Sequence, residues 1–540
     1  MWKNDAFSRA AGMATLFGAL TLAATAQQPA QPAPDFHVSG TLLDATNGEP
    51  VASARVFLAL VDKDEDQTIV VTRENGGFSF AGLAAGRYTL GAHARGYLLQ
   101  AFNQHEEFSS SVVVGPKQDT SHLVFRLMRA STISGVVVDE AGEPVRDAQV
   151  WIYLKLAFDG VEQTRSVGAT GTDDQGSFRF NDLLAGRYFI AVSAHPWYAQ
   201  HGRNPGSGPT DPGTAALDVA YPLTFNGGAT DIASAVPVTL APGERASVEI
   251  ALQPVHAVRI PLNSEGPGGA STGYASLQVR VPDGTTIGLA TQMVSDGSRR
   301  EIVGVAPGRY TMTVNNRAGV ANDLSVASEI EVNSNGEVEK STSSAFVPVT
   351  AKLQLQGTLP AQVSLLLLNK KTRETTSQGL GQDGEVIFKP GVQPGIYEIS
   401  LTDAAGLYLK NVTAEGARVS GRTLEIRPGA PVKLTVNAAR GQGQIAGTAL
   451  RDGKPFMGCM ILLVPADPAH NQVLFRRDQS DSDGSFLFSS VDPGAYTLLA
   501  IENGWGLPWL EAGVLKNYMG RGVSMQVQPN GKHVIEVPVQ

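Results

Sequence analysis

A short turn that ends in tyrosine occurs five times in this chain, and it restricts the possible folds more than any other feature. In each copy a glycine stands two residues before the tyrosine, and Ala or Pro stands before that glycine. After the tyrosine, every second residue is apolar, which is the pattern of a strand with one buried face. Five such copies predict one structural unit that is repeated along the chain. The repeated tyrosines are Tyr88, Tyr188, Tyr310, Tyr397 and Tyr496.

Further strand signals surround each tyrosine. A turn and an aromatic-rich strand come before it, as in residues 74–80 (ENGGFSF) and 482–488 (SDGSFLF). A strand, a Pro/Gly turn and a second strand close each repeat, as in residues 236–252. Short strands with regular turns and almost no helical periodicity predict an all-β fold. We expect a tandem array of about five immunoglobulin- or prealbumin-like β-sandwich domains, with the repeated tyrosines in their cores.

The repeats also divide the chain, whose 540 residues exceed what one hydrophobic core usually supports. The opening strands of the third and fourth repeats are degenerate, and the second repeat carries a Gly/Pro-rich insertion at residues 199–220. The predicted division is a signal peptide at 1–26, a Pro/Gln linker at 27–35, and β-sandwiches at 36–129, 130–255 (with the loop insertion), 256–347, 348–438 and 439–540.

The N-terminus predicts export. Lys3 and Arg9 precede a short apolar run, and the small residues of Ala24-Thr25-Ala26 follow, as in a secretory signal peptide. A membrane anchor is the alternative, but the run is shorter than the about 20 residues that span a bilayer, and no later run approaches that length. We therefore expect a periplasmic, outer-surface or extracellular protein without a membrane span. Cys459 is the single cysteine, so no internal disulfide is possible, and we expect a buried, inert thiol.

Charge excludes some classes of partner. The formal net charge is −9, whereas a nucleic-acid-binding protein normally needs a basic face. The same balance argues against electrostatic binding to anionic lipid. We expect no nucleic-acid partner.

Two catalytic motifs occur literally but in the wrong context. Residues 379–384 match GxGxxG, yet a strand follows at once where a dinucleotide site needs a helix. Residues 269–273 match GxSxG, but no strand-to-helix alternation surrounds them. The nine histidines are scattered, and the acidic run at 62–66 lacks the glycine and final glutamate of an EF-hand. We expect no enzyme activity, no cofactor and no metal site.

Aromatic residues behind the tyrosine strands are the candidate binding residues. Trp197 and Tyr198 follow the second repeated tyrosine, and Trp505 and Trp509 follow the fifth. If exposed on end loops, these rings would stack on sugars or anchor a protein partner. The alternative is that they pack against their own or a neighbouring sandwich.

The first, second and fifth repeats resemble the carboxypeptidase regulatory-like domain, a relative of Cna-B and transthyretin-like sandwiches. The matching residues are SGTLLD and GEPVASARV (39–56) and ENGGFSFAGLAAGRYTL (74–90), with their equivalents in the second and fifth repeats. The first strands lack the lysine that forms an isopeptide bond in many Cna-B domains. The resemblance implies a sandwich fold, export and no catalysis, and the wider fold group raises carbohydrate binding.

Two functions remain open at this stage. The first is an exported binding or adhesion protein that takes glycans through the end-loop aromatics. The second is a structural or protein-interaction scaffold of the cell envelope with no small ligand. A glycan or an envelope protein is the expected partner, and the sequence leaves the oligomeric state undetermined.

Overall fold

A computed structural model gives the fold of the chain. It describes residues 36–540 except 62, 64, 65, 203–211, 263–273, 281–285, 290, 297, 298, 316–324, 335, 336, 361, 382, 405 and 512. The predicted signal peptide and linker, the GxSxG motif, most of the acidic run and the middle of the predicted insertion lie outside the described residues.

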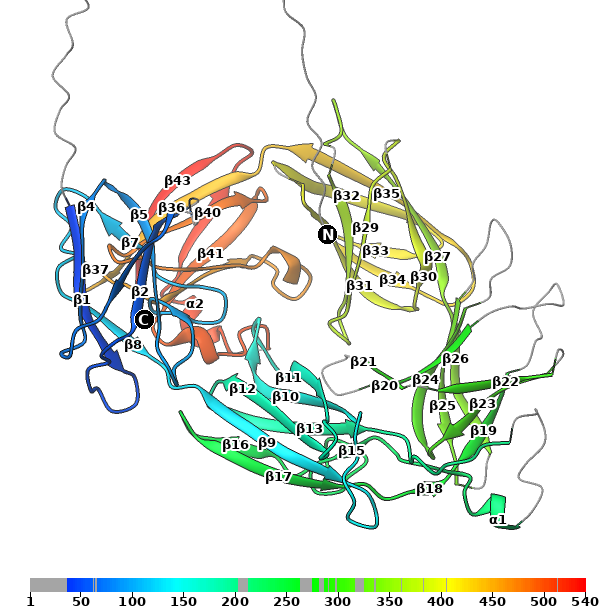
Figure 1. Ribbon diagram of the computed structural model, residues 1–540. Coiled ribbons are helices and arrows are strands. Elements are labelled where there is room, and N and C mark those ends of the chain that lie inside the picture. The colour runs from blue at the N-terminus through cyan, green and yellow to red at the C-terminus, as the bar shows by residue number, and fades with distance from the viewer. Residues whose placement is uncertain are drawn as a thin grey trace, which may run out of the picture.

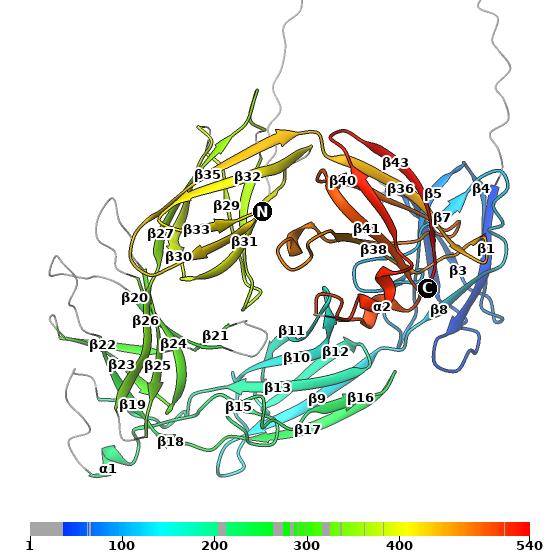
Figure 2. The same ribbon diagram turned by 180° about the vertical axis from the view of Figure 1, so that it is seen from behind.

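Five units, each with two main sheets, follow one another along the chain, as expected for an all-β array of sandwiches, and unit 2 also has a small two-stranded sheet of β14 and β18. Figures 1 and 2 show them arranged in a ring, in which the last unit, orange to red, lies against the first, blue. Each unit has its own buried apolar core. The units are named here by their paired strands, and the exact domain boundaries given above stay a prediction. They span 36–127 (unit 1), 131–256 (unit 2), 258–345 (unit 3), 347–440 (unit 4) and 443–538 (unit 5).

Units 1 and 2 have the same plan. The small sheet of unit 1 has the order β4-β1-β8, and the larger sheet has the order β3-β2-β5-β6 with β7 also on β5. In unit 2 the orders are β12-β9-β17 and β11-β10-β13-β15, with β16 on β13. The strands of unit 1 are β1 (Phe36–Asp44), β2 (Arg55–Leu60), β3 (Thr68–Val71), β4 (Gly77–Leu83), β5 (Gly86–His93), β6 (Gln100–Ala101), β7 (Val112–Val114) and β8 (Leu123–Leu127). Those of unit 2 are β9 (Ser131–Val138), β10 (Gln149–Phe158), β11 (Val161–Gly171), β12 (Ser177–Leu183), β13 (Gly186–Ser193), β14 (Val219–Ala220), β15 (Thr224–Phe225), β16 (Val238–Leu240) and β18 (Val255–His256), with β17 (Arg245–Ala251) and the short helix α1 (Pro212–Ala215).

Unit 3 departs from this plan, and unit 4 largely keeps it. The sheets of unit 3 are β19-β23-β22 and β21-β20-β24-β25-β26, and those of unit 4 are β30-β27-β35-β32 and β29-β28-β31-β34-β33. The strands of unit 3 are β19 (Val258–Leu262), β20 (Tyr274–Arg280), β21 (Thr286–Leu289), β22 (Gln292–Ser295), β23 (Arg300–Val305), β24 (Gly308–Asn315), β25 (Ser325–Val332) and β26 (Val338–Ala345). Those of unit 4 are β27 (Val347–Gln354), β28 (Ser364–Asn369), β29 (Thr375–Gly379), β30 (Glu385–Val392), β31 (Gly395–Thr402), β32 (Leu407–Glu415), β33 (Arg418–Ser420), β34 (Thr423–Ile426) and β35 (Val432–Arg440).

Unit 5 returns to the plan of units 1 and 2. Its sheets are β37-β36-β40, with β43 also on β36, and β39-β38-β41-β42. Its elements are β36 (Gly443–Arg451), β37 (Lys454–Pro455), β38 (Met460–Pro465), the 3-10 turn η2 (Gln472–Leu474), β39 (Arg476–Gln479), β40 (Ser485–Val491), β41 (Gly494–Ile501), the 3-10 turn η3 (Gly504–Gly506), α2 (Lys516–Met519), β42 (Val523–Val527) and β43 (Lys532–Pro538). Among the described residues, no helix is long and apolar enough to cross a membrane.

In each of four units, a pair of parallel strands joins the beginning of the unit to its end. The first strand pairs in parallel with a late strand in β1–β8, β9–β17, β27–β35 and β36–β43. Such a pair needs a long crossover rather than a hairpin, and the tyrosine strand and its partners supply that crossover. Unit 4 has this pair although its opening strand is degenerate in sequence, whereas β19 of unit 3 pairs, among the described residues, only with β23.

The repeated tyrosines form the same corner in every unit. All five rings are buried, and each hydroxyl donates a hydrogen bond to the carbonyl oxygen four residues earlier. The bond closes the tight turn before the tyrosine strand, which explains why glycine and tyrosine recur together. The pairs are Tyr88 with Ala84 (3.0 Å), Tyr188 with Leu184 (2.7 Å), Tyr310 with Ala306 (2.6 Å), Tyr397 with Gln393 (2.8 Å) and Tyr496 with Asp492 (2.9 Å).

Removing one of these hydroxyls should cost measurable stability. We expect Tyr188→Phe to lower the free energy of unfolding by about 1 kcal/mol, because the ring stays in place but the Leu184 carbonyl loses its donor. Urea unfolding followed by tryptophan fluorescence measures the change. An unchanged midpoint would show that water replaces the hydroxyl without cost.

Candidate functional site

The structure separates the four candidate aromatics into two pairs. Trp197 is 87% exposed at the end of unit 2. Trp505 and Trp509 are only 9% and 6% exposed, because they lie in the junction of unit 5 with units 1 and 2. The four rings therefore do not form one exposed surface.

The exposed pair is held by a shared carboxylate. The Trp197 and Tyr198 rings meet edge to face, with centroids 5.8 Å apart. The Tyr198 hydroxyl donates to Glu140, and the Tyr221 hydroxyl donates to the other oxygen of the same carboxylate at 2.8 Å. Burial raises the pKa of the Tyr198 hydroxyl to about 12, and the bond to Glu140 acts in the same direction. Tyr198 is thus fixed in orientation, and the indole of Trp197 projects into solvent.

The buried pair builds an aromatic stack across the junction. The Trp505 ring lies parallel to the His105 ring of unit 1, with centroids 5.0 Å apart and an angle of 7° between the planes. Phe108 of unit 1 contacts the same indole at 5.3 Å. Trp509 packs on Phe475 of its own unit at 4.9 Å. Stacks of this kind join units by apolar burial and leave no open ring face for a sugar.

Arg477 of β39 is the charged centre of this junction. Its side chain is 5% exposed and forms a two-bond pair with Glu106 of unit 1, at 3.1 and 3.0 Å. It also reaches Asp159 of unit 2 at 2.5 Å and Glu107 at 3.4 Å. The guanidinium lies 5.7 Å from the centre of the Trp509 ring. Although burial would lower its pKa, the hydrogen bond and charge of Glu106 raise it, so Arg477 stays a cation.

A second contact between units 5 and 1 runs along the backbone. The Ser482 amide donates to the Ser111 carbonyl at 3.0 Å, and the Val113 amide donates to the Ser482 hydroxyl at 2.8 Å. The Ser110 hydroxyl donates to the Ser480 carbonyl at 2.8 Å. These bonds cover the β7 edge of unit 1, which would otherwise expose unpaired backbone groups.

Asp481 lies beneath this contact, where it is 2% exposed. It accepts a hydrogen bond from the Ser111 amide at 2.7 Å and pairs with Arg87 of unit 1. Burial raises the pKa of this carboxyl to about 6, although the charge of Arg87 acts in the opposite direction. Asp478 lies near enough to raise it further. Ionisation of Asp481 at neutral pH thus opposes docking.

The stability of the docked protein should therefore rise as the pH falls from 7 to 5. Because the folded pKa of Asp481 is about 6 and its ordinary value is 3.8, the folded state takes up a proton in this window that the unfolded state does not. The gain over these two pH units is about 1.3 kcal/mol, because the folded state binds on average about half a proton more than the unfolded state. Urea unfolding at several pH values measures it. Asp481→Asn should flatten the dependence, and Asp452→Asn at an exposed turn of unit 5 should not; equal slopes in the two variants would refute the assignment.

Unit 5 is also held by unit 4. Arg422 of unit 4 pairs with Asp492 of unit 5 at 2.6 Å. Glu398 of unit 4 accepts a hydrogen bond from the Val473 amide of unit 5 at 3.0 Å. Arg373 donates to the Gln472 side chain at 2.7 Å. Unit 5 therefore contacts units 1, 2 and 4, and these contacts close the ring seen in Figure 1.

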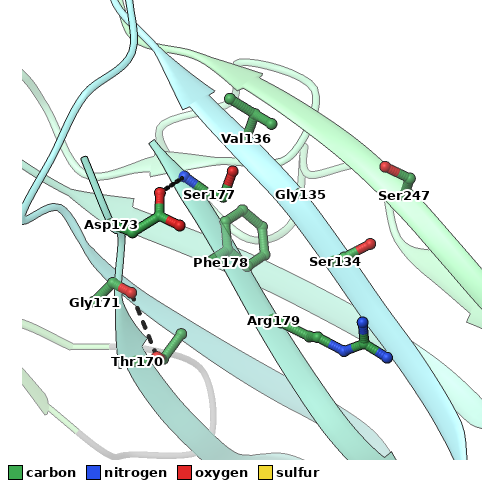
Figure 3. Close-up of a pocket in the computed structure, with 10 residues that line it drawn as sticks. All are labelled: Ser134, Gly135, Val136, Thr170, Gly171, Asp173, Ser177, Phe178, Arg179 and Ser247. Atoms are coloured by element: carbon green, nitrogen blue, oxygen red, sulfur yellow. Dashed lines mark hydrogen bonds between the residues drawn. The ribbon is translucent and has the colours of Figure 1, made fainter. Parts of the chain in front are cut away.

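A shallow depression lies on the small sheet of unit 2. Figure 3 shows Phe178 at its floor beside Gly135 of β9, with Asp173 and Arg179 at its sides. Asp173 accepts a hydrogen bond from the Ser177 amide at 2.8 Å, and Arg179 donates to Asn181 at 2.6 Å. Both charged groups at its rim thus serve their own turn and strand.

The residues that resemble catalytic groups in the sequence have structural roles. The described residues of the 379–384 motif form the turn between β29 and β30, which lie in different sheets of unit 4, and the Gly384 amide donates to the Gly381 carbonyl at 2.9 Å. Cys459 is buried, its thiol lies 3.2 Å from the Ser480 hydroxyl, and burial raises its pKa.

The residues that close the ring gave little signal in the sequence. Glu106 lies in the run His105-Glu106-Glu107-Phe108-Ser109, which does not match the zinc-binding HExxH pattern, and Arg477 stands in an ordinary polar strand. Asp159-Gly160 predicts a hairpin turn, but nothing in the sequence indicates what that turn contacts.

Comparison with known proteins identifies part of the chain. The sequence model of the carboxypeptidase regulatory-like domain matches residues 37–128 and 132–253. No curated protein matches the chain in sequence.

Solved structures with related folds include pilins. A streptococcal ancillary pilin has 12% identity and a TM-score of 0.20, over 53% of this chain and 99% of that one. A minor pilin of Streptococcus agalactiae has 13% identity and a TM-score of 0.21, over 41% and 96%. The major pilin subunit of Bacillus cereus has 9% identity and a TM-score of 0.14, over 75% and 99%.

Proposed function

Because residues 37–128 and 132–253 form two carboxypeptidase regulatory-like domains, we propose that the protein is an exported, non-catalytic scaffold of the cell envelope. The observation that carries this proposal is the junction of unit 5, where Trp505 and Trp509 are buried against units 1 and 2. Aromatic residues that join units serve architecture rather than a small ligand.

Export is part of the proposal. Lys3, Arg9 and the Ala24-Thr25-Ala26 segment support a cleaved leader, and the single cysteine fits a protein that needs no disulfide in an oxidising compartment. Cell fractionation, N-terminal sequencing of the mature chain and protease treatment of intact cells test it. A mature chain that begins near residue 27 in the periplasm, envelope or medium supports export, and an uncleaved cytoplasmic chain refutes it.

The scaffold proposal also predicts the kind of partner. Cross-linking of intact cells followed by mass spectrometry should recover envelope proteins attached to this chain. Recovery of this chain without any envelope protein, although it is exported, would contradict a scaffold role.

Glycan binding at Trp197 is the second candidate function. The exposed indole supports it, because a flat apolar ring fixed beside Tyr198 is suited to stack on a sugar. The predicted insertion at 199–220 follows directly in the chain, and its residues 203–211 lie outside the described residues.

Trp197→Ala should weaken glycan binding at least about tenfold, because the ring would supply most of the contact. A glycan array followed by titration calorimetry measures the loss. The matched control is Val534→Ala, which removes an apolar side chain that is also strongly exposed, in unit 5. Absence of binding to any glycan by the parent protein, or equal binding by Trp197→Ala, would eliminate this candidate.

A further inference from the structure

The contact that closes the ring joins parts of the chain that are far apart. Arg477 pairs with Glu106, 371 positions away, and with Asp159, 318 positions away. The chain reaches unit 5 only through units 3 and 4, as Figures 1 and 2 show. The contact is built from hydrogen bonds, ion pairs and ring stacking, so it is reversible in principle.

The surface of units 1 and 2 that contacts unit 5 is called the seat, and its shape is specific for unit 5. The tip of the β10–β11 hairpin fits under the Trp509 ring, and the Leu510 amide donates to the Gly160 carbonyl at 2.8 Å. Gly160 has φ +74°, and a Cβ at this position would overlap the indole. Asp159, its neighbour, pairs with Arg477. The shape and the charge of this hairpin tip are therefore both complementary to unit 5.

Both junctions of unit 5 also contain a buried carboxyl group that opposes closure. Asp481 is buried against unit 1. Glu398 of unit 4 is 0% exposed where it meets unit 5, and its Oε2 atom has no hydrogen-bond partner among the described residues. A buried acceptor without a donor favours the open form, in which water can reach it. The closed ring is thus held by strong contacts but is not free of strain.

A short connection offers a hinge. Only Gly441 and Gln442 separate β35 from β36, and Gly441 has φ +116°. Glycine at such a φ tolerates large changes of backbone direction. The hinge is fastened by Asp492, which pairs with Arg422 and accepts a hydrogen bond from Gln442 at 3.0 Å.

We infer that unit 5 is a detachable element, and that its seat on units 1 and 2 also accepts unit 5 of a second copy of this chain. Swinging out at Gly441 would expose the seat around His105, Phe108 and Gly160 together with the Trp505 and Trp509 rings. Each open chain then carries one free seat and one free unit 5. Two open copies can therefore form a domain-swapped dimer, in which unit 5 of each copy binds to the seat of the other. Within one chain the seat and unit 5 are held close, which favours the closed ring at low concentration. This inference rests on the proposed scaffold function, to which it adds a means of assembly.

The test uses two full-length variants with defects on opposite sides of the contact. Gly160→Ala spoils the seat, because the new Cβ overlaps Trp509. Arg477→Gln spoils unit 5, because a neutral amide cannot neutralise Glu106 and Asp159. Neither variant can close its own ring or exchange with itself. Unit 5 of the first, however, fits the seat of the second.

Size-exclusion chromatography with light scattering gives the result. Each variant alone should have the mass of one chain, and the equimolar mixture should contain a species of twice that mass. A mixture that keeps the mass of one chain would overturn the inference, and so would dimers formed by either variant alone, because they would use another surface. Should Arg477→Gln fail to fold by circular dichroism, Trp509→Ala replaces it as the defective unit 5.

The matched control is Gly142→Ala, also in unit 2. Gly142 has φ +82°, close to that of Gly160, but nothing lies within 4 Å of a Cβ there. It carries the same backbone strain with an intact seat, so it should form no dimer when mixed with Arg477→Gln. Since the assay uses purified protein, its failure would leave export and envelope partners untouched, and failure of those would not change the measured masses.

Discussion

Arg477→Ala should open the ring, with a loss of about 3 kcal/mol in the free energy of docking unit 5. The substitution removes the cation that pairs with the 12%-exposed Glu106, and removing one partner of a buried ion pair leaves the other charge desolvated. Glu107 and Asp159 are more than half exposed, so water screens them and they add little. The ring stacking around the guanidinium is weakened as well. Sedimentation velocity and small-angle X-ray scattering should report a smaller sedimentation coefficient and a larger radius of gyration.

Arg146→Ala is the control for this prediction. Arg146 pairs with Asp147, but both side chains are more than three-quarters exposed, and such pairs contribute little. The control should keep the sedimentation coefficient of the parent protein. If Arg477→Ala also keeps it, the remaining contacts with units 1 and 4 suffice to hold the ring closed, and Arg477 is not its centre.

The sequence predicts the sandwiches because their signals are local. A glycine turn, a tyrosine and alternating apolar residues all lie within about ten positions, so one unit of period-two structure can be recognised without any knowledge of its neighbours. The corner bond of Tyr188 spans four residues. The parallel pair of β1 and β8 joins positions that are some 80 residues apart, and no pattern in the sequence predicts this pairing.

The contacts that close the ring cannot be predicted from such local patterns. Trp505 and Trp197 occupy the same place after their tyrosines, yet one is buried and the other is exposed. The difference arises because His105 and Phe108, about 400 positions before Trp505, cover its ring. A single sequence shows that a ring is available for contact, but which surface meets it depends on how five units are placed in space.

The sequence shows a glycine in the opening strands, but only the structure shows why glycine is needed there. Gly135 and Gly447 stand at the same place in the first strand of units 2 and 5. In both, the ring of the facing phenylalanine, Phe178 or Phe486, occupies the space that a Cβ would take. Glycine here makes room for an aromatic ring in the core, so a strand that would gain propensity from a larger residue keeps the smallest one.

Gly447→Ala should therefore destabilise unit 5 by about 3 kcal/mol, the upper end of the usual cost of overpacking a core. The added methyl group would overlap both the Phe486 ring and the backbone carbonyl of Ile535, and a β-sheet carbonyl cannot move aside as a flexible side chain does. Urea unfolding measures the loss, and Gly520→Ala is the control, because nothing lies within 4 Å of a Cβ at the end of α2. Since unit 5 also closes the ring, Gly447→Ala should lower the sedimentation coefficient at denaturant concentrations where the parent is still closed. A variant as stable as the Gly520→Ala control would mean that Phe486 can leave its place without loss, and that the recurring glycine has another cause.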